Sequence, residues 1–114
     1  MKTFGNFRSI DQIMLFNAQQ GFHYFSHNTM RAFGSRVGQT LYGGCVFTES
    51  IHNWDRTSRV YRVKIAMSDG SIETLADNCI STSSANRIAK RWAESIENGS
   101  TIYDPQKGEF IAIE

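Results

Sequence analysis

The chain lacks most features of exported, membrane-bound or multidomain proteins. It has a single proline, Pro105, among 114 residues, and no stretch rich in serine, glycine and proline, so the sequence predicts no linker or low-complexity segment. No apolar run approaches the roughly 18 residues that a transmembrane helix needs, and the first residues lack the apolar core of a signal peptide. We therefore expect one domain spanning residues 1–114, located in the cytoplasm and without membrane contact.

Cysteine is scarce as well, with only Cys45 and Cys79 in the chain. Thiols in a reducing compartment seldom form structural disulfides, and an unpaired cysteine behaves as a small apolar side chain. The two cysteines are expected to be buried thiols.

The sequence also lacks the motifs of common catalytic and metal sites. It contains no glycine-rich phosphate loop between a strand and a helix, no G-x-S-x-G nucleophile elbow and no converging carboxylate pair. His23 and His27 have the i, i+4 spacing of two metal ligands on a helix, but the aromatic residues between them disfavour a continuous helix. We expect no catalytic residue, no metal and no cofactor, and we interpret the chain as a protein that is not an enzyme.

What the sequence does have is an ordinary globular composition with uneven charge. Hydrophobic residues make up 40% and charged residues 20%, enough for one modest core. The net charge is only +1, yet residues 1–92 carry +5 and residues 93–114 carry −4. A basic body with an acidic tail can hold a strong local field although the total is near zero.

Three helices are expected from capping residues and apolar spacing. A Ser9–Gln12 capping box starts a helix at about 10–19, which a glycine then stops. A shorter helix is expected at about 27–36. The third, at about 83–98, repeats apolar residues every four positions and is capped by one of three neighbouring hydroxyl residues: Ser81, Thr82 or Ser83.

Strands are expected at about 40–50, with a bend or bulge at two consecutive glycines, and at 58–67 and 71–77. The Asp69-Gly70 pair predicts a type I′ hairpin between the last two, pairing Met67 with Ile72 and Ala66 with Glu73. In that register Glu73 lies diagonal to Lys64 on an outer, solvated face. A small hairpin or edge strand ends the chain.

These elements predict an α+β fold of order α-α-β-β-β-α. A three-stranded antiparallel sheet packs on the C-terminal helix, with the small hairpin or edge strand added. An open edge of the sheet leaves both a monomer and a homodimer as alternatives.

The most distinct predicted surface is a basic strand face with a tryptophan beside it. It consists of Trp54, Arg56, Arg59, Arg62 and Lys64. Arginine binds phosphate, and tryptophan stacks on bases or anchors protein partners. The alternative interpretation is a solvated face whose cations pair with acidic neighbours and bind no ligand.

Residues 28–98 resemble the element order of the double-stranded RNA-binding domain, which implies a nucleic-acid-binding module using this face. That family grips phosphates with lysines at the start of its last helix. Here those positions are Ser83, Ser84, Ala85 and Asn86, and only Arg87 is cationic. Nucleic-acid binding is therefore the alternative function.

Several phrases resemble a family of small bacteriophage and prophage proteins. They lie within residues 22–77 and read Tyr24-Phe25-Ser26, Thr29-Met30-Arg31, Phe33-Gly34-Ser35-Arg36, Tyr42-Gly43-Gly44, Phe47-Thr48-Glu49-Ser50, Tyr61-Arg62-Val63 and Asp69-Gly70-Ser71-Ile72. The resemblance implies a phage accessory protein that binds a bacterial host protein or ribonucleoprotein complex and inhibits it, as an anti-CRISPR or other anti-defence protein does.

Such an inhibitor needs a stable scaffold and interface anchors, for which aromatic and arginine residues are typical. Tyr42 and Tyr103 join Trp54, Arg56 and Arg59 as candidates for partner binding. The acidic tail either mimics phosphate in a nucleic-acid groove of the target or only solubilises the chain.

Overall fold

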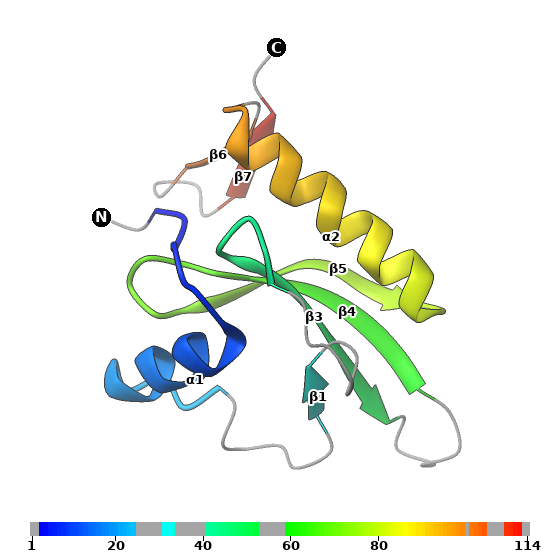
Figure 1. Ribbon diagram of the computed structural model, residues 1–114, viewed down its shortest axis with the longest axis horizontal. Coiled ribbons are helices and arrows are strands. Elements are labelled where there is room, and N and C mark those ends of the chain that lie inside the picture. The colour runs from blue at the N-terminus through cyan, green and yellow to red at the C-terminus, as the bar shows by residue number, and fades with distance from the viewer. Residues whose placement is uncertain are drawn as a thin grey trace.

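The computed structural model describes residues 3–24, 31–33, 41–52, 59–99, 101–104 and 109–112. These form an α+β fold, as predicted. The predicted order of two helices and a three-stranded sheet is wrong, because one helix precedes the main sheet and five described strands join it. Figure 1 shows a twisted sheet with one helix on each side. In chain order the elements are α1 (Ile10–Gln19), β1 (Arg31–Phe33), β2 (Leu41–Tyr42), β3 (Val46–His52), β4 (Arg59–Ala66), β5 (Ile72–Cys79), α2 (Thr82–Glu97), β6 (Thr101–Asp104) and β7 (Glu109–Ala112).

The main sheet is antiparallel and has the order β1-β3-β4-β5, with β2 pairing the same strand, β3, as β1 does. β1 occupies one half of that edge of β3 and β2 the other. The expected terminal hairpin is present as the separate pair β6–β7. Among the described strands β5 is the last of its sheet.

Each face of the sheet has its own core. On one face α2 buries residues that include Val46, Val63 and Ile65. On the other face α1 contributes Ile10 and Ile13, which pack with buried Phe47 and Ala66 of β3 and β4. Because neighbouring strand residues point to opposite faces, Val46 and Phe47 belong to different cores.

The N-terminal segment joins these two cores across the end of the sheet. The Gly5 N–H donates to the Ala66 carbonyl at 2.9 Å, and the Phe7 N–H donates to the Gly44 carbonyl at 2.7 Å. Phe4 packs against the α2-side core and Phe7 against the α1-side core. These hydrogen bonds hold the start of the chain against the sheet before α1 begins.

α1 begins and ends as the sequence predicts, and one buried amide fixes its position. Ser9 caps the helix by accepting from the Gln12 N–H. Asn17, only 1% exposed, donates to the Gly70 carbonyl at 2.7 Å and accepts from the Tyr24 N–H at 2.8 Å. Asn17 thereby links α1 to the β4–β5 turn and to the segment after the helix.

The helix predicted at 27–36 is wrong at its centre, where residues 31–33 form strand β1. Its outer parts, 27–30 and 34–36, lie outside the described residues. The local pattern was weak, because Gly34 and Gly38 disfavour a helix there. The unpaired edge of β3 instead offers backbone hydrogen bonds to residues 31–33, and this long-range pairing overrides local propensity.

The expected strand at 40–50 is a hairpin of β2 and β3. Its two glycines, Gly43 and Gly44, have φ values of 61° and 83°, a left-handed conformation that glycine adopts without steric cost. The glycines therefore reverse the chain where a bend or bulge was predicted.

The β4–β5 hairpin exists, but its predicted turn and register are wrong. Met67 accepts from the Gly70 N–H and donates to the Ser71 carbonyl, and only Gly70 of the two turn residues has positive φ, at 93°. This is a type I turn followed by a glycine bulge. Ala66 therefore pairs with Ile72 and Ile65 with Glu73, which places Glu73 on the face opposite to Lys64.

Candidate functional site

Three charged residues share the α1 side of the sheet. Glu49 lies directly opposite Arg62 in the β3–β4 register, and Lys64 is two residues further along β4. Glu49 is completely buried and Lys64 is 7% exposed. The predicted solvated outer face is therefore wrong for Lys64, because the helix and the segment that follows it lie on this side.

These residues are held by specific polar contacts. Tyr24 Oη donates to Glu49 Oε1 at 2.7 Å, and Lys64 Nζ lies 5.6 Å from the centroid of the Tyr24 ring. Lys64 Nζ also donates to Thr74 Oγ1 on β5. A buried charge is tolerated when it is paired and hydrogen-bonded, and these contacts engage one oxygen of Glu49 and the amine of Lys64. We name buried Glu49 and Lys64, together with half-buried Tyr24, the buried polar cluster. Thr74, which accepts from Lys64, is exposed at its edge.

Arg62 lies at the edge of this cluster. Its side chain is 31% exposed, and its Nε lies 2.6 Å from Asp77 Oδ1 on β5. The structure thus brings Arg62 and Lys64 to one face, as predicted, but each already has a partner within the chain. Neither offers an unengaged cation for phosphate.

The other predicted partner-binding residues lie on separate elements or outside the described residues. Tyr42, in β2, is half-buried against the α2-side core. Arg59 begins β4 and Tyr103 lies in β6. Trp54 and Arg56 lie outside the described residues.

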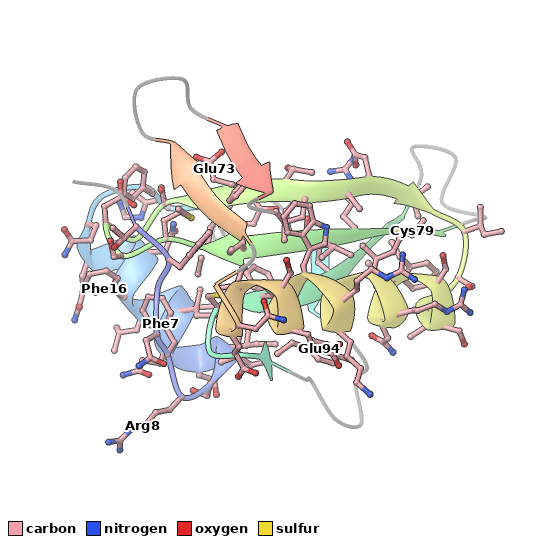
Figure 2. The ribbon with its side chains drawn as sticks, turned by 90° about the horizontal axis from the view of Figure 1, so that it is seen from above. Phe7, Arg8, Phe16, Glu73, Cys79 and Glu94 are labelled. Atoms are coloured by element: carbon pink, nitrogen blue, oxygen red, sulfur yellow. The ribbon has the colours of Figure 1, made fainter. Side chains whose placement is uncertain are left out.

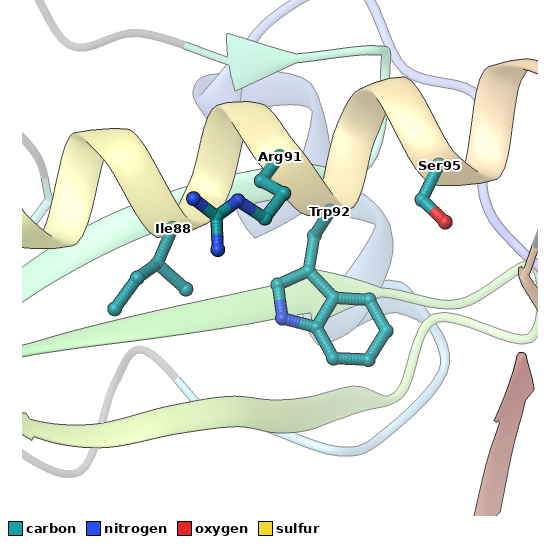
Figure 3. A pocket seen from close by; sticks show the side chains of 4 residues that line it. All are labelled: Ile88, Arg91, Trp92 and Ser95. Atoms are coloured by element: carbon teal, nitrogen blue, oxygen red, sulfur yellow. The ribbon is translucent and has the colours of Figure 1, made fainter.

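A hollow that the sequence did not single out lies along one side of α2. It has a volume of about 310 Å³ and is lined by Ile88, Arg91, Trp92 and Ser95. Figure 3 shows Ile88 and Trp92 directed from the helix toward the sheet, with Arg91 and Ser95 above them on the same side of α2. We call this feature the α2 groove.

The way in which α2 packs explains the groove. The residues fully in contact with the sheet are small: Ala85, Ala89 and Ala93 are at most 6% exposed. Ile88 and Trp92 lie to one side of these alanines and are only half-buried. The Trp92 ring meets Phe110 of β7 edge-on, with the ring centroids 5.7 Å apart, and this contact holds the tryptophan beside the groove.

The solvent side of α2 is charged in two blocks. Arg87, Lys90 and Arg91 are exposed in its middle turns, and Glu94 and Glu97 are exposed near its end. The structure places Arg91 at the rim of an apolar hollow.

Both cysteines are buried free thiols, as predicted. Burial, reinforced by the negative charge of Glu97, raises the pKa of the Cys45 thiol from 9.0 to about 11. Burial, with a smaller effect of Asp77, also raises the pKa of Cys79. A thiol with a raised pKa carries little of the nucleophilic thiolate at neutral pH, which disfavours either cysteine as a nucleophile.

The Cys45 shift predicts a specific loss of stability in alkali. Because the folded state holds the Cys45 proton more tightly than the unfolded state does, its stabilising effect is complete below pH 9 and is lost as the pH rises to about 11. Urea unfolding at pH 8 to 11 should show wild type losing more stability across this window than Cys45→Ala. Parallel curves for the two proteins would contradict the prediction.

Nothing in the described segments forms a metal site of three or more histidine, cysteine, aspartate or glutamate side chains. His23 has a φ of 53° and follows the end of α1, so it is not helical, while His27 lies outside the described residues. Across those same segments, no helix is long and apolar enough to cross a membrane.

Comparison with known proteins gives no relationship from which a function can be transferred. No family model, no curated protein and no solved structure matches the chain. The resemblance to small phage proteins is therefore carried by the quoted sequence motifs alone.

Proposed function

We propose that this chain is a phage-encoded accessory protein that binds one bacterial host complex and inhibits it stoichiometrically, as an anti-CRISPR or related anti-defence protein. The observation that supports binding is the α2 groove, where half-buried Ile88 and Trp92 lie beside exposed Arg91. Tryptophan and arginine are the residue types that most often dominate binding energy at protein interfaces.

The size of the groove favours a side chain of a partner over a cofactor. Small-molecule sites generally measure about 300–1,000 Å³ and enclose most of their ligand. The α2 groove, at about 310 Å³, lies at the lower end of that range and is open along the helix. It accommodates one or two side chains of a larger partner.

The buried polar cluster supports the same interpretation. It brings together the acid, phenol and amine groups of Glu49, Tyr24 and Lys64, yet Glu49 and Lys64 are buried. Their contacts tie β3, β4 and β5 to the segment after α1. The buried polar cluster therefore stabilises the fold, and we assign partner binding to the exposed surface.

A second candidate function is nucleic-acid binding, favoured by the exposed Arg87, Lys90 and Arg91 on α2. It would use this helix in place of the strand face that the sequence suggested. It predicts an affinity that falls steeply as salt rises, because each phosphate contact releases counterions.

The test is affinity purification of the tagged protein from an infected or CRISPR-bearing bacterium, followed by mass spectrometry. We expect one host protein or ribonucleoprotein complex at a fixed ratio, resistant to nuclease and to moderate salt. Recovery of no specific partner would contradict the proposal. Recovery of mixed proteins that nuclease releases would favour the second candidate.

A further inference from the structure

We propose that the α2 groove binds an acidic segment of the partner protein, with one apolar side chain of that segment inserted between Ile88 and Trp92 and a carboxylate beside Arg91. This inference rests on the proposed function and assigns it a site and a partner chemistry.

The shape of the groove supports the apolar anchor. Ile88 and Trp92 each keep part of their surface in water although both pack against the α2-side core. Covering that surface with an apolar side chain gains about 25 cal/mol per Å² removed from water. The apolar side chain between Ile88 and Trp92 therefore supplies affinity, and Arg91 selects segments that carry a carboxylate beside that side chain.

The charges of α2 support the acidic neighbours, because they oppose the stability of the helix itself. Arg87 and Arg91 are like charges at i, i+4, an arrangement that destabilises an isolated helix. An anionic group beside Arg91 would relieve this repulsion.

The same surface disfavours nucleic acid as the occupant. The Trp92 ring already meets Phe110 and is half-buried, so it is not an open stacking platform for a base. Exposed Glu94 and Glu97 follow the cations along the helix, where they would repel a phosphate backbone that continues along α2. A protein segment needs a carboxylate only beside Arg91 and can place uncharged residues over these glutamates.

Selection of peptides from a randomised display library tests the chemistry without knowledge of the partner. Purified wild-type protein is the bait, and Arg91→Glu is the counter-selection. The matched control is Arg8→Glu, since Arg8 is exposed and projects outward from the N-terminal segment, away from α2 (Figure 2). Circular dichroism melting checks that both variants stay folded.

We expect the enriched peptides to share one aromatic or aliphatic residue flanked by aspartate or glutamate. They should bind Arg91→Glu at least tenfold more weakly than wild type and bind Arg8→Glu within twofold of wild type. No enrichment over the counter-selection would overturn the inference. Enrichment of basic or uncharged peptides would overturn it as well.

The indole N–H of Trp92 reports where the peptide binds. A ¹⁵N-labelled protein shows one indole signal for each of its two tryptophans, and Trp92→Phe assigns them. The best selected peptide should shift the Trp92 signal. A peptide that leaves it in place, a single-stranded oligonucleotide that shifts it more strongly at equal concentration, or a dimer of this chain that Arg91→Glu dissociates would each overturn the inference.

The host partner separates this inference from the proposed function. If wild type and Arg91→Glu capture the same host complex equally, the protein is a binding protein but its site is elsewhere. If selected peptides bind the groove and no host complex is recovered, the groove is assigned correctly and the proposed function fails.

Discussion

Replacing Glu49 by alanine is expected to destabilise the protein by about 3–5 kcal/mol, the usual range for removal of one charged member of a buried cluster. Glu49 is 0% exposed and accepts from Tyr24 Oη at 2.7 Å. It lies on the same sheet face as Arg62 and Lys64. When Glu49 is replaced, the ammonium group of Lys64 stays buried on a sheet face that no longer carries the Glu49 carboxylate.

Conservative variants separate the charge of Glu49 from its shape. Glu49→Gln keeps the volume and an acceptor for Tyr24, so it should lose less stability than Glu49→Ala. Tyr24→Phe removes one hydrogen bond to a buried carboxylate and should lose about 1–3 kcal/mol. Urea unfolding monitored by circular dichroism measures all three variants.

Glu94→Gln is the control for the loss of an acidic side chain at the surface. Glu94 is exposed on α2, and its replacement should change stability by no more than about 0.5 kcal/mol. If Glu49→Ala proved as mild as Glu94→Gln, the buried polar cluster would not stabilise the fold.

Local sequence signals sufficed for elements whose ends are set by neighbouring residues. The capping serines Ser9 and Ser81 accept from the N–H groups of Gln12 and Ser84, so both helix starts were predictable. The alternating pattern of residues 58–67 likewise predicted β4. Each of these signals acts within a few residues, and tertiary packing agrees with it.

Local sequence signals did not predict the structure of segments whose conformation or burial depends on contacts with a distant part of the chain. β1 forms because β3 offers an edge to it, which nothing between residues 27 and 36 shows. The β4–β5 register follows from the conformation of Asp69, since the same Asp-Gly pair is compatible with two kinds of turn. Lys64 appeared solvated because alternation alone does not reveal that α1 and Tyr24 cover the second face.

The α2 groove was missed for a related reason. The repeat of Ile88, Trp92 and Ile96 predicted an apolar face of the helix but not which residues lie at the centre of the helix–sheet contact. The structure places Ala85, Ala89 and Ala93 there. Small residues let a helix and a sheet approach closely, and the larger side chains then extend beside the contact. Six apolar positions on one helix were a signal that the apolar arc is wider than a single stripe.

This packing makes Ala89→Leu the second large effect, with an expected loss of about 3 kcal/mol, the upper part of the range for overpacking a buried site. Ala89 is 0% exposed, so the added carbons have no space unless α2 moves away from the sheet. Thermal and urea unfolding measure the loss. Glu94→Leu introduces the same side chain on the exposed side of α2 and should be nearly neutral.

The same substitution also tests whether the groove depends on the close approach of α2. If the alanines hold the helix near the sheet, Ala89→Leu must displace Trp92 from its edge-on contact with Phe110. The indole N–H signal of Trp92 should then shift in the folded state at temperatures well below unfolding, whereas Glu94→Leu should leave it unchanged. A stable Ala89→Leu protein with an unmoved Trp92 signal would show that the sheet yields at this position, and that the alanines are not what shapes the groove.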